Sequence, residues 1–127
     1  MIWYIAVGSA LGGVLRYLLG GAIQRAAGPG FPVGTMLVNI SGSFLLGFLL
    51  RYATQPPSLT PELRAFLTVG LCGGYTTFST FSAETVGLMQ DGQWGKALTY
   101  ALGSVVLALA ATAAGFAAGQ PFAAGRG

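Results

Sequence analysis

Four long apolar stretches separated by three short turns constrain this chain more than any other feature. The stretches cover about residues 2–23, 33–53, 62–89 and 96–118, and a membrane-crossing helix needs about 20 such residues. The turns combine Gly, Pro and polar residues, as in Gly28-Pro29-Gly30, Pro56-Pro57 and Asp91-Gly92. No stretch alternates polar and apolar residues as barrel strands do. The sequence therefore predicts an all-α polytopic membrane protein, with one transmembrane domain of four helices over residues 1–127.

The composition excludes several classes of function. Of the 127 residues 54% are hydrophobic and 7% are charged, whereas soluble domains carry about 25% charged residues. The net charge of +3 comes from scattered side chains, which argues against a nucleic-acid partner. The chain has no His and one Cys, so a Cys/His zinc site is excluded, and no GxxxxGK[ST] segment indicates a nucleotide. The N-terminus lacks the basic region of a cleaved signal peptide.

The basic residues give almost no preference for one orientation in the membrane. With four crossings, Arg51, Arg64 and Arg126 fall on one side, and Arg25 and Lys96 fall on the other. The side with more Lys and Arg usually faces the cytoplasm. Three against two either selects one orientation weakly or leaves the chain to insert both ways.

Polar residues recur on single faces of two spans. Thr35, Asn39 and Ser43 are spaced by four in the second span, and Tyr100, Ser104 and Thr112 share a face of the fourth. Such groups either join helices by hydrogen bonds or line a polar path. Arg16, near the middle of the first span, either snorkels to the interface or places a positive charge beside an anion vestibule.

The third span, with the sequence LTVGLCGGYTTFSTFSAET over residues 67–85, is expected to break near residues 73–77. Glycine and hydroxyl residues there disfavour a continuous helix. The break is either a packing kink or a place where freed carbonyls bind a cation such as sodium. Phe78 and Phe81 follow at helical spacing, and they either pack in a core or present positive ring edges to a small anion. Ser79 and Thr80 add neutral hydroxyl donors beside the rings.

Small residues favour close helix packing. Gly8 with Gly12, Gly70 with Gly74, and Gly115 with Gly119 form GxxxG pairs. The chain shows no internal repeat, whereas inverted-repeat transporters need two oppositely oriented halves. A second copy in the opposite orientation would supply the missing half.

Three segments of the chain resemble the Fluc (CrcB) family of fluoride channels. They are GGVLRY at residues 12–17, GTMLVNISGSFLLG at residues 34–47 and GLCGGYTTFSTFSAE at residues 70–84. The order and spacing of the three make chance similarity improbable, and the resemblance covers nearly the whole chain. It implies an antiparallel, dual-topology homodimer in the inner membrane of a prokaryote, with two fluoride pores and a structural Na⁺ at the dimer interface.

The resemblance also implies roles for individual residues. Phe78 and Phe81 would form an aromatic box along each pore, and Asn39 would donate its amide to fluoride or orient a ring. The remaining pore residues would be Tyr100, Ser104, Thr35, Ser79, Thr80 and the vestibule arginine Arg16, with Glu84 and Thr112 as weaker members. Backbone carbonyls of Gly73 and Thr76 would coordinate the sodium. Ala108 departs from the pattern, because a hydroxyl there would extend the path on the fourth helix.

These observations predict passive export of fluoride through a selective channel, which lowers cytoplasmic fluoride and confers resistance to it. A coupled antiporter of the small multidrug type is the alternative, but that class depends on a carboxylate in the first span, where this chain has Arg16. A scaffold subunit would need neither the break nor the polar stripes. An enzyme is disfavoured, because the chain has no His and no paired carboxylates in the membrane.

Overall fold

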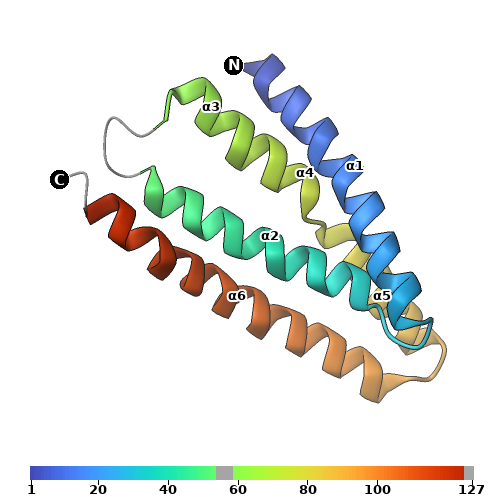
Figure 1. The fold of residues 1–127 in the computed structure, drawn as a ribbon. Coiled ribbons are helices and arrows are strands. Elements are labelled where there is room, and N and C mark those ends of the chain that lie inside the picture. Colours follow the sequence, from blue (N-terminus) through green and yellow to red (C-terminus); the bar gives the residue numbers. More distant parts are fainter. Residues whose placement is uncertain (54–58, 125–127) are drawn as a thin grey trace.

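The computed structural model describes residues 1–53 and 59–124, and this part of the chain is helical with no strand. The elements are α1 (Ile2–Ala27), α2 (Val33–Tyr52), α3 (Pro61–Ala65), the π-helix η1 (Phe66–Cys72), α4 (Gly73–Tyr75), α5 (Phe78–Gln90) and α6 (Trp94–Ala124). The helices lie roughly side by side (Figure 1). The N-terminus, the last residues of α2, the start of α3 and the end of α6 lie at one end, and the α1–α2 and α5–α6 turns lie at the opposite end (Figure 1).

Three helices are long and apolar enough to cross a membrane: α1, α2 and the part of α6 from Trp94 to Gln120. The apolar runs predicted these helices, and the prediction of an all-helical polytopic membrane protein is confirmed. The predicted third span is divided among α3, η1, α4 and α5, so no single helix in it reaches the length of a full crossing. The predicted turn with Pro56-Pro57 lies outside the described residues, as does Arg126.

The break in the third span falls on threonines, whereas the glycines before it remain helical. Gly73 and Gly74 belong to α4, and the backbone becomes extended at Thr76 (φ −84°, ψ 159°) and Thr77 (φ −150°, ψ 121°). The chain therefore leaves the helix at Thr76 and Thr77, within the segment 73–77, and not at Gly73-Gly74. The wide turn of η1, from Phe66 to Cys72, was not predicted.

Gly70 and Gly74 of the broken segment serve packing. A Cβ on Gly12 would overlap the carbonyl oxygen of Leu71, and a Cβ on Gly70 would lie 3.0 Å from the Cα of Gly8. A Cβ on Gly74 would come within 2.9 Å of the Cα of Ser9. Backbone therefore lies against backbone between α1 and the η1–α4 segment, as the GxxxG pairs predicted.

A second close contact joins α2 to α6. Cβ atoms on Gly47 and Gly115 would overlap the carbonyl oxygens of Thr112 and Phe44, respectively, and one on Gly119 would lie 2.9 Å from that of Phe48. The third predicted GxxxG pair therefore also lies in a helix contact. Only a few large side chains are wholly buried in the described part, among them Tyr100, Val38 and Cys72. The apolar outer faces of α1 and α6 are left for lipid or a second copy to cover.

Candidate functional site

The break between α4 and α5 is held open by Asn39 of α2. Asn39 Nδ2 donates to the Thr77 carbonyl oxygen at 3.0 Å, and Asn39 Oδ1 accepts from the Thr77 N–H at 2.8 Å. One side chain thus satisfies both polar groups of an extended residue at mid-helix, which would otherwise be costly in hydrocarbon. The amide that was predicted to face fluoride or orient a ring is used in this way to fix the backbone just before Phe78.

The Thr77 hydroxyl begins the second half of the broken helix. Thr77 is the N-cap of α5: its Oγ1 accepts from the Thr80 N–H at 3.2 Å and donates to Thr80 Oγ1 at 3.1 Å. Ser79 Oγ lies 3.5 Å from the same hydroxyl. A hydroxyl N-cap is a strong start signal for a helix. Thr77 therefore ends the break by capping α5, and Asn39 of α2 fixes the Thr77 backbone.

Four backbone carbonyls, those of residues 73–76, lose their helical donors at the break, and the carbonyls of Gly73 and Thr76 are two of them. In a continuous helix the Thr77 N–H would bond the Gly73 carbonyl, but here it donates to Asn39. Likewise, the Thr80 N–H would bond the Thr76 carbonyl, but it donates to the Thr77 hydroxyl. The break thus frees the carbonyls of Gly73 and Thr76, the two groups that the resemblance assigns to sodium.

Arg16 binds the carbonyl that lies between these two positions. Its Nε donates to the Gly74 carbonyl oxygen at 3.3 Å. The guanidinium therefore does not snorkel freely, because it is tied to the end of α4. It also lines a cavity with its remaining surface, so the structure combines a packing contact with a charge beside open space.

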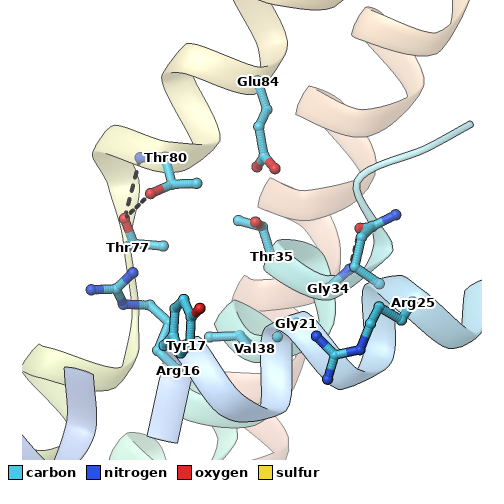
Figure 2. A pocket seen from close by; sticks show the side chains of 12 residues that line it. Arg16, Tyr17, Gly21, Arg25, Gly34, Thr35, Val38, Thr77, Thr80 and Glu84 are labelled. Atoms are coloured by element: carbon cyan, nitrogen blue, oxygen red, sulfur yellow. Dashed lines mark hydrogen bonds between the residues drawn. The ribbon is translucent and has the colours of Figure 1, made fainter. Parts of the chain in front are cut away.

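Two cavities flank the break and meet at Thr77. The first, of about 270 Å³, lies between α1, α2 and α5, where Glu84 extends from α5 toward Thr35 (Figure 2). The second, of about 260 Å³, also has Thr77 in its lining and is lined by both phenylalanines. The first is lined by Arg16, Tyr17, Gly20, Gly21, Gln24, Arg25, Gly34, Thr35, Val38, Thr77, Thr80 and Glu84. The second is lined by Asn39, Gly42, Ser43, Leu46, Thr76, Thr77, Phe78, Phe81, Ser104, Val105 and Ala108.

The second cavity is lined mostly by neutral groups. Ser104 is 6% exposed, and its Oγ lies among protein atoms without a hydrogen-bond partner in the described part of the chain. Ala108 lies beside it, at the position where a further hydroxyl was missing from the pattern. A buried hydroxyl without a partner is costly, so it is a candidate to bind water or an anion.

A row of aromatic rings runs from this cavity into the core. The Phe78 and Phe81 centroids are 5.7 Å apart, the Phe81 and Tyr100 centroids 5.2 Å, and the Tyr100 and Phe31 centroids 5.6 Å with the rings perpendicular. Tyr100 is fully buried, and its hydroxyl donates to Glu84 Oε1 at 2.9 Å. Phe78, at the other end of the row, is 78% exposed. The row thus connects an open surface with the carboxylate of the first cavity.

The predicted site residues fall into distinct groups. Arg16, Thr35 and Thr80 line the first cavity, and Asn39, Phe78, Phe81, Ser104 and Thr76 line the second. Tyr100 is buried between Phe31 and Phe81, while Ser79 and Gly73 are exposed near the break. The Thr112 hydroxyl donates to the Ala108 carbonyl of its own helix at 3.0 Å.

Sequence reasoning missed Thr77 and Phe31. The signal for Thr77 was available, because a hydroxyl residue directly before a helical run is a typical N-cap. No local pattern could have paired Phe31 with Tyr100, since 69 positions separate them in the sequence. Glu84 was only a weak candidate, but it lines the first cavity and binds Tyr100.

The fold and these cavities define a small polytopic membrane protein with a broken helix bordered by polar space. A family model described as CrcB-like protein, Camphor Resistance (CrcB), matches residues 3–116. The chain belongs to this family, and the resemblance drawn from the three sequence segments is confirmed.

Similar curated proteins cover most of the chain. One from Rhizobium meliloti (strain 1021) is 47% identical over 116 residues, which are 91% of this chain and 93% of the relative. One from Thermus thermophilus is 51% identical over 105 residues, 83% of each chain. A third, from Aquifex aeolicus (strain VF5), is 41% identical over 120 residues, 94% of this chain and 97% of the relative. All three are named fluoride-specific ion channel FluC.

Proposed function

We propose that this chain forms a fluoride-selective channel that exports fluoride passively and so lowers its cytoplasmic concentration. The observation that carries the proposal is the pair of cavities that share Thr77, one with two arginines and hydroxyl groups in its lining and the other with neutral hydroxyl, amide and ring groups. The names of the relatives support the same ion and the same activity, and they support the prediction that the chain is not an enzyme.

The chemistry of the lining suits a small anion with a costly hydration shell. Hydroxyl donors such as Ser104 and the positive edges of Phe78 and Phe81 would replace part of that shell without a charge that traps the ion. Arg16 and Arg25 line the first cavity and would attract anions into it. A negative-inside potential drives each anion outward by about 2.3 kcal/mol per 100 mV, so no coupled energy source is needed.

An antiparallel homodimer, with four crossings per chain, would complete the path. Phe78 is 78% exposed, although it lines the second cavity, so a single chain leaves one wall of that cavity open. Arg51 lies in the last turn of α2 and Arg64 in the last turn of α3, whereas Arg25 lies in the last turn of α1 and Lys96 in the first turn of α6. These two sets of helix ends lie at opposite ends of the molecule (Figure 1). Balanced basic residues favour insertion in both orientations. The bacterial relatives support placement in the inner membrane of a prokaryote.

A structural sodium ion fits the donors at the break. The described residues hold no group of three acidic, Cys or His ligands, but Gly73 and Thr76 offer carbonyls freed from helical bonds. Carbonyls of unwound helices are known sodium ligands. The same carbonyls of a second copy would complete the oxygen shell. Bound there, sodium would supply positive charge that holds the two broken helices together.

A flux assay tests the function. Purified protein in liposomes loaded with fluoride should release it when a potassium ionophore supplies the electrical driving force, without a proton gradient. Liposomes loaded with chloride are the matched control and should release little. Release only under a pH gradient would instead indicate the coupled antiporter, and no release under either condition would contradict both transport hypotheses.

A labelling assay tests the dimer. Gln93 lies in the α5–α6 turn, so a Gln93→Cys substitution places a thiol at one end of the molecule. A membrane-impermeant thiol reagent applied outside intact cells should label about half of the chains if both orientations are equally populated. Labelling of nearly all or almost none of them would overturn the dual-topology dimer.

A further inference from the structure

Gln24, near the end of α1, uses every hydrogen-bonding group of its side-chain amide to bind the turn that follows. Its Nε2 donates to the carbonyl oxygens of Gly28 at 2.6 Å and Phe31 at 2.9 Å, and its Oε1 accepts from the Gly34 N–H at 3.0 Å. Both amide hydrogens and the oxygen are therefore used on three backbone groups of one turn. A single side chain thus joins the end of α1, the turn and the start of α2.

The hydrogen bond from the Gly34 N–H to Gln24 replaces a missing cap at the start of α2. The N-cap of α2 is Pro32, whose side chain cannot accept a hydrogen bond, and Gly34 is in the first turn of that helix. First-turn N–H groups have no partner within the helix and need one from outside. Gln24 supplies it from the preceding helix. The same amide binds the Phe31 carbonyl, so it fixes both the start of α2 and the backbone that carries the Phe31 ring.

The Phe31 ring packs against Tyr100, the residue that binds Glu84. It meets the Tyr100 ring edge to face at 5.6 Å, on the opposite end of the aromatic row from Phe81 and Phe78. Tyr100 has no exposed surface, and its hydroxyl donates to Glu84. Phe31 and Phe81 therefore limit the positions that the Tyr100 ring can take, and the ring position decides where the Glu84 carboxylate is held.

Glu84 and Gln24 lie where two cavities meet. Both line the first cavity, and both also line a neighbouring cavity of about 340 Å³ at the end of the molecule that carries the α1–α2 turn. Phe31 and Asp91 line this outer cavity too. Figure 2 shows Glu84 directed into the first cavity, toward Thr35. An ion passing between the two spaces would pass these side chains.

We propose that Gln24 and Phe31 are positioning residues for the ion path, which hold the Tyr100 hydroxyl on Glu84 at the junction of the first and outer cavities. This inference rests on the proposed function. It assigns the α1–α2 turn a part in conduction, because the turn braces one side of the aromatic row. Neither residue needs to touch the ion for its loss to change the flux.

Fluoride flux from liposomes is the first test. Gln24→Met keeps the size of the side chain and removes its hydrogen bonds, and Phe31→Leu removes the ring. Each should lower fluoride flux about fivefold, because each would release the Tyr100–Glu84 hydrogen bond, and a fivefold change is what the loss of one ordinary hydrogen bond produces. Gln90→Met, an exposed Gln at the same end of the molecule, is the matched control and should leave the flux unchanged.

A second background separates positioning from general stability. If Gln24 acts through the Tyr100 hydroxyl, Gln24→Met should add no further loss of flux in a Tyr100→Phe protein, because the Glu84 bond is already gone. A fivefold further loss in that background would overturn the proposal. A wild-type protein without fluoride flux would overturn the proposed function instead.

A spectroscopic test decides the positioning role whether or not the protein conducts. Protein labelled with 3-fluorotyrosine gives a ¹⁹F resonance for each of its five tyrosines, and Tyr100→Phe identifies the one from position 100. Gln24→Met and Phe31→Leu should both shift or broaden that resonance and leave those of Tyr4, Tyr52 and Tyr75 in place. An unchanged Tyr100 resonance in Gln24→Met, in protein that elutes as the wild type does, would overturn the proposal.

Discussion

Two neighbouring parts of the third span are packed by opposite means. Up to Gly74, the backbone of this span lies against Gly8 and Gly12 of α1, and this contact, which includes Gly70, Leu71 and Gly74, is called the glycine seam. After the seam, the chain opens into the polar break, defined here as Thr76 and Thr77 with their partner Asn39. In the seam, backbone packs directly on backbone. In the break, the Asn39 side chain supplies the backbone hydrogen bonds that a continuous helix would have made.

This contrast shows where polar chemistry can exist inside a bilayer. Helices in lipid associate through van der Waals packing and small residues, without any help from water. Irregular backbone at the same depth is tolerated only if protein or a polar cavity satisfies it. The seam therefore fixes α4 rigidly against α1, and this lets the next residues leave the helix and border two cavities. Four substitutions test whether the seam and the break are held in these different ways.

Gly12→Leu should prevent correct assembly altogether. Its Cβ would overlap the Leu71 carbonyl oxygen and lie 2.7 Å from the Tyr75 nitrogen, so backbone would have to move, at a cost of about 3 kcal/mol or more. The measurement is the yield of monodisperse protein in size-exclusion chromatography. Gly13→Leu is the matched control, because a Cβ at Gly13 meets nothing within 4 Å. Equal yields for the two variants would contradict the account of the seam.

Asn39→Leu should destabilise the break by about 2 kcal/mol. It leaves the Thr77 N–H and carbonyl without partners in an apolar site, and each unsatisfied group costs about 1–3 kcal/mol. Thermal unfolding in detergent is the measurement. Thr112→Val is the comparison, since that hydroxyl donates only within its own helix and its loss should matter much less. A melting temperature for Asn39→Leu as high as that of Thr112→Val would show that the two hydrogen bonds between Asn39 and Thr77 are dispensable.

Phe81→Ile should lower fluoride flux about tenfold, equivalent to about 1.4 kcal/mol, while the protein still assembles. The Phe81 ring contacts both Phe78 and Tyr100, and a branched aliphatic side chain offers no positive ring edge to an anion. Flux from fluoride-loaded liposomes measures the effect, and Phe116→Ile on the outer face of α6 is the control. Wild-type flux in Phe81→Ile would count against a role for the rings.

Thr77→Ala should cost about 1 kcal/mol, the usual value of a hydroxyl N-cap. The extended backbone at the break would remain, because Asn39 still binds the Thr77 peptide groups. Thr77→Ser keeps the hydroxyl and should restore most of the loss in a thermal melt. A Ser variant as unstable as the Ala variant would indicate that the methyl group, and not the cap, is what matters.

The fold was more predictable from the sequence than the site. Apolar length and the Gly/Pro turns predicted the long helices, and spacing alone placed Gly8, Gly12, Gly70 and Gly74 in a helix contact. Glycine was expected to break the third span, because it disfavours helix by about 1 kcal/mol per residue. The close approach of α1 to Gly74 opposes that preference, and Gly73 and Gly74 both stay helical while the threonines carry the break.

The amino-acid sequence alone predicts what lies in the membrane, namely long apolar helices, small residues at regular spacing and a few neutral polar groups. The tertiary structure alone decided which of those groups meet. Asn39 reaches Thr77 from another helix, and Phe31 reaches Tyr100 from the α1–α2 turn. Local preferences near the break differ by only about 1 kcal/mol, whereas each buried backbone group left unpaired costs as much or more. The position of the break therefore follows the hydrogen-bond partner that another helix provides.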